Sequence, residues 1–258
     1  MSTWILLRGL TRETRHWGRF PAILRDAVKT DSLLQLDLPG NGALVDLRAP
    51  AQVPSMIEFV RRAVSQSSVP GPYRVLAMSL GGMVATAWAQ HYPEEIDRLV
   101  LINTSMRPFS SMTERLRPQA WPRLLRVAAG WRDAREAETI IHRLTCNDPQ
   151  ALAGDLAAWA AIRESAPVSR GNALRQLWAA ARFNAGDTVP RCATLILSSA
   201  QDRLVNPVCS AKLAAAWGAA HIQHPWAGHD LPHDDPVWTS GTVGAWLPEV
   251  VDTMGKRF

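Results

Sequence analysis

The segment Arg74–Tyr92, RVLAMSLGGMVATAWAQHY, is the stretch from which the fold of the whole chain can be inferred. Val75–Ala77 is a short apolar run of the kind that forms a buried strand. The residues Met78–Gly82 contain Ser79, and two glycines follow it closely. The run from Gly82 to Tyr92 is typical of a helix. We therefore predict a strand, a tight turn with Ser79 at its tip, and a helix that begins directly after the turn.

Small residues surround Ser79, because Ala77 lies before it and Gly81 and Gly82 lie after it. A nucleophile elbow requires this, since its strained backbone pushes a hydroxyl out over the edge of a sheet where larger neighbours would clash. The N-terminus of the following helix favours negative charge near that hydroxyl. Ala77 stands where glycine is usual, so the motif alone leaves an ordinary serine in a strand–helix connection as an equal alternative.

Composition limits the class of protein. The 258 residues suit one large domain, or one domain with an insertion, and 47% hydrophobic with 20% charged residues is typical of a soluble globular chain. No apolar stretch has the length of a membrane span, and Trp4–Leu7 is too short for a signal peptide. Cys146, Cys192 and Cys209 are odd in number and lack metal-ligand spacing. We expect no disulfide framework, no metal site and a location in the reducing cytoplasm.

The net charge of +5 is unevenly distributed along the chain. Residues 107–191 contain 13 Arg, no Lys and 8 acidic residues, a balance of +5. The remaining residues contain 12 Arg and 3 Lys against 15 acidic residues, a balance of zero. Two interpretations remain equal: a solvated helical surface, or a surface that attracts an acidic partner or an anionic substrate.

Apolar runs typical of buried strands alternate with helical patterns over most of the chain, which predicts an α/β fold whose parallel sheet is covered on both faces. We expect six strands, all parallel, without the N-terminal antiparallel hairpin common in related folds. They are Trp4–Leu7, Leu33–Asp37, Val75–Ala77, Arg98–Asn103, Ala193–Ser198 and His221–Pro225. Between residues 107 and 191 only helix-forming stretches occur. We therefore predict a core of residues 1–106 and 192–258, interrupted by a helical cap, residues 107–191.

Polar residues follow several of these strands at the edge where functional groups gather in parallel sheets. Ser79, Asp202 and His229 follow the third, fifth and sixth strands, and the chain order Ser…Asp…His is that of α/β-hydrolase triads. The chain resembles the α/β-hydrolases, in particular the esterase group that includes the pimeloyl-carrier-protein methyl esterases and the ring-cleavage-product hydrolases. The matching pieces are Leu6–Leu10, Asp37–Gly42, Met78–Gly82, Leu99–Asn103, Ala200–Asp202 and Gly228–Asp230.

The resemblance implies a role for each residue of the proposed site. Ser79 would attack an acyl carbonyl, and His229 would take its proton and return it to the leaving group. Asp202 would fix the tautomer of the ring and stabilise the imidazolium. The backbone N–H groups of Leu80 and Leu10 would form the oxyanion hole, in which one donor is typically worth about 3 kcal/mol. No metal or organic cofactor is expected.

Other residues compete for roles in this site. His233 also lies in the last loop, but His229 is preferred because Gly228 precedes it, as in the family. Asp230, Asp234 and Asp235 follow the histidine too closely to support it, and we interpret them as loop turns or as a cap for the last helix. The candidates for the substrate pocket are Arg8, Met106, Trp121 and Trp178, with Trp159 as a further cap tryptophan. For any one of the three tryptophans, burial among the cap helices is the preferred interpretation.

Arg8 stands where the family usually has histidine, and it is either a structural arginine bound to nearby carbonyls or a clamp for a substrate carboxylate. The predicted function is hydrolysis of a small-molecule carboxylic ester through an acyl-enzyme. An acidic acyl group, or an acidic acyl carrier protein, would suit the basic cap. The alternatives are a carbon–carbon bond hydrolase on the same scaffold and a ligand-binding member without activity, which Arg8 and Ala77 favour. Neither a nucleic-acid partner nor a membrane span is expected.

Overall fold

A single six-stranded sheet forms the centre of the protein in the computed structural model, which describes residues 3–30, 32–148 and 150–254. The strands are β1 (Trp4–Leu7), β2 (Leu33–Leu36), β3 (Tyr73–Met78), β4 (Ile96–Ile102), β5 (Ala193–Ser199) and β6 (Ala220–His224). Their order is β2-β1-β3-β4-β5-β6, and each neighbouring pair is parallel. The predicted α/β fold with six parallel strands is confirmed.

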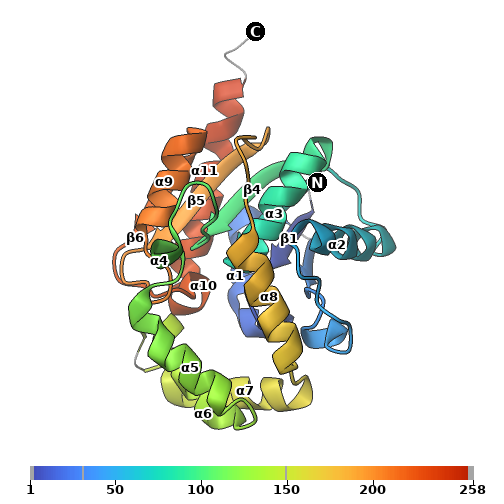
Figure 1. The fold of residues 1–258 in the computed structure, drawn as a ribbon. Coiled ribbons are helices and arrows are strands. Elements are labelled where there is room, and N and C mark those ends of the chain that lie inside the picture. The colour runs from blue at the N-terminus through green and yellow to red at the C-terminus, as the bar shows by residue number, and fades with distance from the viewer. Residues whose placement is uncertain (1–2, 31, 149, 255–258) are drawn as a thin grey trace.

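The two faces of the sheet carry two separate apolar cores, because successive residues of a strand point to opposite sides. On one face, side chains such as Ile5 and Val75 pack with α2 (Pro54–Gln66), α3 (Leu80–His91) and α9 (Val208–Trp217). On the other face, side chains such as Leu6 and Leu76 pack with α1 (Phe20–Val28) and α11 (Pro236–Met254). Burial on both faces explains why the central strands have apolar runs such as Val75–Ala77 and Leu99–Ile102, whereas the edge strands β2 and β6 are partly exposed (Figure 1).

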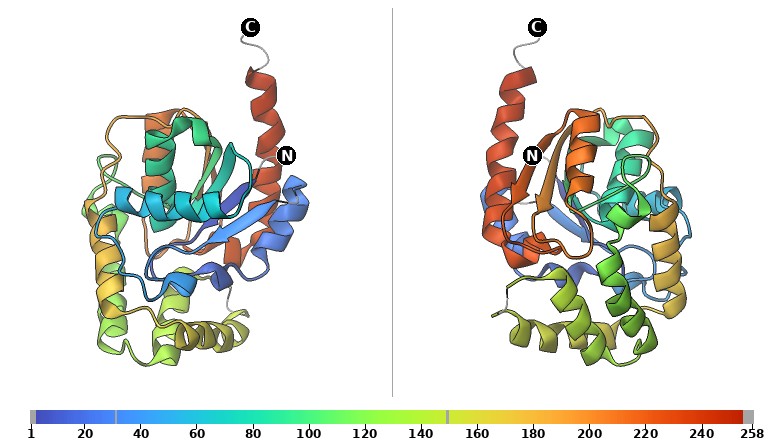
Figure 2. Two further views of the ribbon diagram at one scale, coloured as in Figure 1. Left: turned by 90° about the vertical axis from the view of Figure 1, so that its right-hand side faces the viewer. Right: turned by 60° about the vertical axis from the view of Figure 1, so that its left-hand side comes forward.

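Helices fill the chain between β4 and β5. They are α4 (Met112–Arg115), α5 (Trp121–Ala129), α6 (Ala134–Thr145), α7 (Leu152–Ser165) and α8 (Arg170–Arg182). Figure 2 shows α5, α6 and α7, coloured green to yellow, as a layer beyond one end of the sheet. The domain boundaries remain a prediction, and we keep the name cap for residues 107–191.

Buried polar contacts join the cap to the rest of the protein. Glu138 of α6 accepts hydrogen bonds from Arg12 at 2.6 Å and from Arg163 of α7 at 3.0 Å. Asn172 of α8 accepts a hydrogen bond from the backbone N–H of Ala49 at 2.9 Å. The contacts of Arg12 and Ala49 with the cap are buried away from water, where hydrogen bonds are strong, so they fix the position of the cap over the sheet.

Within residues 3–30, 32–148 and 150–254, no helix combines the length and the apolar character that crossing a lipid bilayer requires.

Candidate active site

Ser79 lies at a sharp turn between β3 and α3, as predicted. Its backbone has φ 48° and ψ −117°, a left-handed conformation that a residue with a side chain rarely adopts. Hydrogen bonds on both sides hold it there: the Ser79 N–H donates to the carbonyl of Ile102 at 3.1 Å, and the Thr104 hydroxyl donates to the Ser79 carbonyl at 2.8 Å. The surrounding structure therefore maintains a strained backbone at this serine.

The glycines after Ser79 are required by close packing. A Cβ atom at Gly81 would lie 2.5 Å from the carbonyl oxygen of Arg8, and one at Gly82 would lie 2.8 Å from the side chain of Thr104. A Cβ atom at Gly9 would lie 3.1 Å from the Cβ of Ser79. The segment after β1 thus passes directly beside the turn, which explains why small residues occur in both segments.

His229 and Asp202 form a buried pair. The Nδ1 atom of His229 lies 2.7 Å from Oδ2 of Asp202. The other carboxylate oxygen of Asp202 accepts hydrogen bonds from the backbone N–H groups of Leu204 at 2.7 Å and Val205 at 2.9 Å, so both of its oxygens are bound. Burial lowers the pKa of His229, but the charge and hydrogen bond of Asp202 outweigh it, and the pKa is raised overall. Asp202 therefore orients the ring and stabilises its protonated form.

Asn103, at the end of β4, is a positioning residue that the sequence analysis did not identify. Its side-chain amide donates to the backbone carbonyl of His229 at 2.8 Å and accepts from the N–H of Ser199 at 2.9 Å. It thereby connects the loop of His229 to the end of β5. The signal that could have found it was a polar residue at the end of the predicted strand Arg98–Asn103, the strand that follows the one before Ser79 along the chain.

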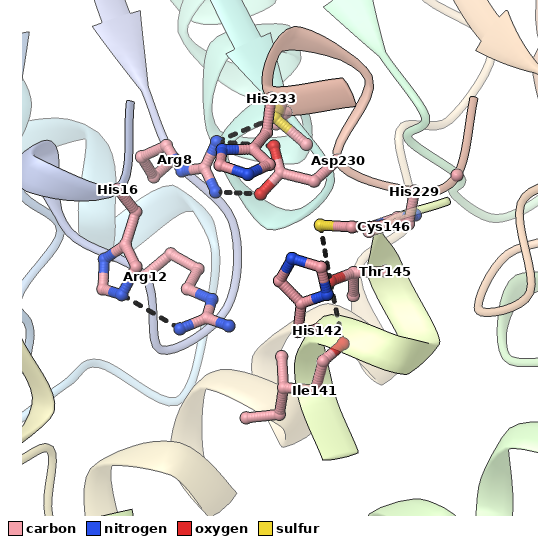
Figure 3. A network of polar contacts seen from close by, with 12 residues as sticks. Arg8, Arg12, His16, Ile141, His142, Thr145, Cys146, His229, Asp230 and His233 are labelled. Carbon is pink, nitrogen blue, oxygen red and sulfur yellow. Dashed lines mark hydrogen bonds and ion pairs between the residues drawn. The ribbon is translucent and has the colours of Figure 1, made fainter. Parts of the chain in front are cut away.

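Arg8 forms a buried ion pair with Asp230, with distances of 2.9 and 2.6 Å between the two pairs of side-chain atoms (Figure 3). The guanidinium also lies over the ring of Trp17, 4.7 Å from its centre. Burial would raise the pKa of Asp230, but the charge and hydrogen bonds of Arg8 lower it to about 2. Asp230 does begin a turn, since its backbone carbonyl accepts from the N–H groups of His233 and Asp234, but the sequence did not reveal the partner of its side chain. Its carboxylate neutralises an arginine that lies beside Gly9 and Leu10.

A cavity of about 260 Å³ lies between the elbow and the cap. Ser79 and His229 both line it, together with Arg8 and Leu10. The other lining residues are mostly apolar cap residues: Leu124, Val127, Ala128, Trp131, Ile141, Leu144, Thr145, Arg170, Ala173, Leu174 and Leu177, with Gly9, Thr11, Arg12, Met78, Leu204 and Asp230 from the core. The cavity therefore has the polar side chains of Ser79 and His229 on one side and mostly apolar side chains of the cap around the rest.

The structure does not bring all predicted pocket residues to this cavity. Met106 is buried in the apolar core on the face of the sheet that α2, α3 and α9 cover. Trp121 and Trp178 are 49% and 56% exposed and lie outside the cavity lining, although Leu124 of α5 and Leu174 of α8 line it. Trp159 is buried and packs against the rings of His142 and His233, each 5.1 Å away between ring centres. Helical periodicity does not tell which side of a cap helix faces the cavity.

The two predicted oxyanion donors flank the serine. Leu80 is the first residue of α3, and the first N–H groups of a helix have no partner within it. Leu10 lines the cavity beside Ser79. Both N–H groups stay candidates for binding a negative oxygen.

The remaining residues of the last loop have structural contacts. Asp234 accepts hydrogen bonds from the N–H groups of Gly228 at 2.7 Å and Asn147 at 2.9 Å. Asp235 accepts one from the N–H of Trp238 at 3.0 Å, which confirms it as a cap of the last helix. His233 contacts Asp155 of α7 at 2.7 Å.

Comparison with known proteins finds a matching family, related sequences and similar solved structures. The family described as alpha/beta hydrolase fold matches residues 7–236. The biotin biosynthesis bifunctional protein BioHC of Teredinibacter turnerae is 30% identical over 156 residues, which are 58% of this chain and 24% of that protein. The pimeloyl-[acyl-carrier protein] methyl ester esterase of Chromobacterium violaceum is 29% identical over 110 residues, 42% of this chain and 37% of that protein. Both matches span well under half of the relative's length.

Solved structures agree with the fold. The enol-lactonase of Burkholderia xenovorans LB400 superposes with a TM-score of 0.76 at 20% identity, covering 96% of this chain and 92% of the other. At this identity the likeness is one of fold alone.

Proposed function

This chain belongs to the alpha/beta hydrolase fold family, and from this premise we propose that it is a serine hydrolase that cleaves carboxylic esters. The observation that carries the proposal is the arrangement around Ser79. The serine occupies a strained turn in the same cavity as His229, and the ring of His229 is bound to the buried Asp202 at 2.7 Å. A strained serine, a base and an orienting acid at one edge of a sheet are the groups that acyl transfer needs.

The proposed mechanism follows from these positions. The imidazole of His229 takes the proton of the Ser79 hydroxyl, whose oxygen attacks the ester carbonyl carbon. Negative charge then develops on the carbonyl oxygen, where the N–H groups of Leu80 and Leu10 stabilise it. The protonated ring gives its proton to the departing alcohol, which leaves an acyl-enzyme. Water, activated by the same histidine, releases the acid and restores the serine.

The cavity supports an apolar acyl chain of modest size. Its volume of about 260 Å³ and its lining of leucine, isoleucine, valine and alanine side chains from the cap would exclude water from such a chain. Leu174 and Leu177 of α8 line the cavity and are also exposed, so the opening lies along this helix. Exposed residues beside an opening suit a substrate that is only partly enclosed.

The surface of the cap supports a narrower proposal, in which the acyl group is delivered by an acidic carrier protein. Arg123, Arg132 and Arg135 are exposed on the cap, which carries all of the excess positive charge of the chain. The curated relative of Chromobacterium violaceum is named for an ester linked to an acyl carrier protein. Positive charge on the cap would attract and orient such a carrier.

The non-catalytic alternative rested on Arg8 and Ala77. Arg8 has a partner in Asp230, and Ala77 is fully buried in the core beneath the elbow. Both residues therefore have structural explanations that are compatible with catalysis.

Substitution of Ser79 by alanine tests the proposal. We expect the wild type to hydrolyse p-nitrophenyl esters, with a preference among graded chain lengths set by the cavity. Ser79→Ala should lose this activity by several orders of magnitude while its circular dichroism is unchanged. Retained turnover in a folded Ser79→Ala protein would reject the proposal.

A further inference from the structure

His142, Cys146 and His233 meet beneath the site, although they come from separate parts of the chain. His142 lies in the last turn of α6, and Cys146 directly follows this helix. His233 lies in α10 (Leu231–Asp234), four positions after His229. One ligand atom from each residue lies within 4.8 Å of the other two. Figure 3 shows the side chains of His142 and Cys146 close together at the end of α6, with His233 nearby.

A fourth ligand is already in contact with this group. Oδ2 of Asp155, on α7, lies 2.8 Å from Nε2 of His142 and 2.7 Å from Nε2 of His233. The two ring nitrogens therefore converge on one carboxylate oxygen, from two different elements. We propose that His142, Cys146, His233 and Asp155 form a zinc site that joins the cap to the loop carrying His229. This proposal is independent of the proposed esterase activity.

The donor set selects the metal. Two imidazole nitrogens, one thiolate and one carboxylate are the ligand types that zinc takes in tetrahedral sites, whereas magnesium and calcium prefer oxygen alone. Zinc displaces the thiol proton of Cys146, which leaves to solvent. The thiolate and the carboxylate of Asp155 then balance the two positive charges of the ion. Charge balance matters here because His142 and Cys146 are buried.

The geometry requires only a small adjustment. With zinc–nitrogen bonds of about 2.0 Å and zinc–sulfur bonds of about 2.3 Å, tetrahedral ligand atoms lie roughly 3.3 to 3.6 Å apart. Ligand atoms of His142, Cys146 and His233 all lie within 4.8 Å of one another, so a separation near that limit must close by roughly 1.2 to 1.5 Å. The contacts of Asp155 with the two rings, 2.8 and 2.7 Å, must open by roughly 0.5 to 0.9 Å, and rotation of side chains achieves both changes. The ion replaces the two hydrogen bonds between Asp155 and the rings, and each neutral ring then carries its proton on Nδ1 instead of Nε2.

Surrounding residues hold the ligands in position. The indole of Trp159 packs against both imidazoles, with ring centres 5.1 Å from His142 and 5.1 Å from His233. The guanidinium of Arg12 also lies over this indole, 4.4 Å from its centre. Such support for the ligands is typical of metal sites.

The site is structural in kind. Four protein ligands leave no open position for water or substrate, and none of the four lines the cavity of Ser79. Bound zinc links α6 and α7 of the cap to α10 of the core. The expected consequence is a higher melting temperature in the presence of zinc, because an ion that binds only the folded chain stabilises it.

Cobalt and zinc binding to the full chain tests the site. The protein is stripped with a chelator, freed of chelator, and titrated with Co²⁺, and zinc is then added. We expect about one cobalt per chain with the near-ultraviolet absorption of a thiolate–cobalt bond, lost when zinc replaces cobalt. Mass spectrometry of the metal content should then give about one zinc per chain, and the melting temperature should rise.

Variants separate this site from adventitious binding. Cys146→Ser should abolish the thiolate absorption, and His233→Gln should weaken zinc binding at least about tenfold. The matched controls Cys209→Ser and His221→Gln alter a buried cysteine and a histidine elsewhere, and should bind as the wild type does. A wild type that shows no thiolate–cobalt absorption overturns the proposal, whether or not the variants fold. Equal binding by Cys146→Ser and Cys209→Ser overturns it as well.

Discussion

Arg8 and Asp230 are separated by 222 positions in the chain, and their side chains form a buried, two-pronged ion pair. Arg8 directly precedes Gly9 and Leu10, the segment that passes beside Ser79. Asp230 directly follows His229. The pair therefore connects the segment of Gly9 and Leu10 to the loop of His229. Its two hydrogen bonds fix the distance and the orientation of these two segments relative to each other.

Removing one member of this pair should destabilise the protein. Arg8→Ala leaves a buried carboxylate without a partner, and Asp230→Ala leaves a buried guanidinium, so each should cost about 3–5 kcal/mol in the free energy of unfolding. Urea denaturation measures this. The double variant should lose clearly less than the sum of the two single losses. Additive losses would mean that the two side chains do not interact in the folded protein.

The rate of ester hydrolysis should depend on the protonation of His229. The ring acts as a base only when neutral, so kcat/KM should fall as the pH is lowered through its pKa. Since Asp202 raises this pKa, the midpoint should lie above the ordinary value of 6.5. Asp202→Asn should move the midpoint of the residual activity downward. A wild-type midpoint below 6.5 would contradict the arrangement of the pair.

The backbone strain at Ser79 should lower the free energy of unfolding, and a glycine at this position should relieve it. Glycine adopts the observed φ of 48° and ψ of −117° freely, whereas alanine retains the strain. We expect Ser79→Gly to be more stable than Ser79→Ala by about 1 kcal/mol in urea denaturation. Ser65, within the helix α2, is the matched control, and there the glycine variant should be the less stable one. The same order at both positions would contradict a strained elbow.

Charge reversal on the cap tests the carrier proposal. Arg123→Glu, Arg132→Glu and Arg135→Glu together should lower kcat/KM for a carrier-linked methyl ester at low salt and remove most of its salt dependence. Hydrolysis of a small p-nitrophenyl ester should change little. The control reverses Arg19, Arg25 and Arg62, which are exposed outside the cap. Equal losses in both triple variants would point to net charge and away from a docking surface.

Much of the fold could be predicted from local patterns. Strands that are buried on both faces are continuously apolar, so a run such as Leu99–Ile102 can be recognised as a strand from the sequence. Small residues likewise indicate the turn at Ser79. The His229–Asp202 contact followed because both residues were expected after strands, at the same edge of one sheet.

Contacts between distant side chains could not be predicted in this way. The partner of Arg8 lies in a loop that local reasoning interprets as a turn. The four proposed zinc ligands lie on α6, α7 and α10 or directly after α6. Local spacing indicates metal ligands only when they are close in sequence, as in short cysteine or histidine motifs. Which side of an amphipathic cap helix faces the cavity is equally a tertiary property, as Trp121 and Trp178 show.

Labelling with a fluorophosphonate probe tests the central claim most directly, because the probe reacts with a serine whose hydroxyl is activated by a neighbouring base. Peptide mass spectrometry of the wild type should locate the label on Ser79, and His229→Gln should reduce the labelling rate by orders of magnitude. Absence of labelling at Ser79 across a range of pH, in a folded wild-type protein, would contradict the account.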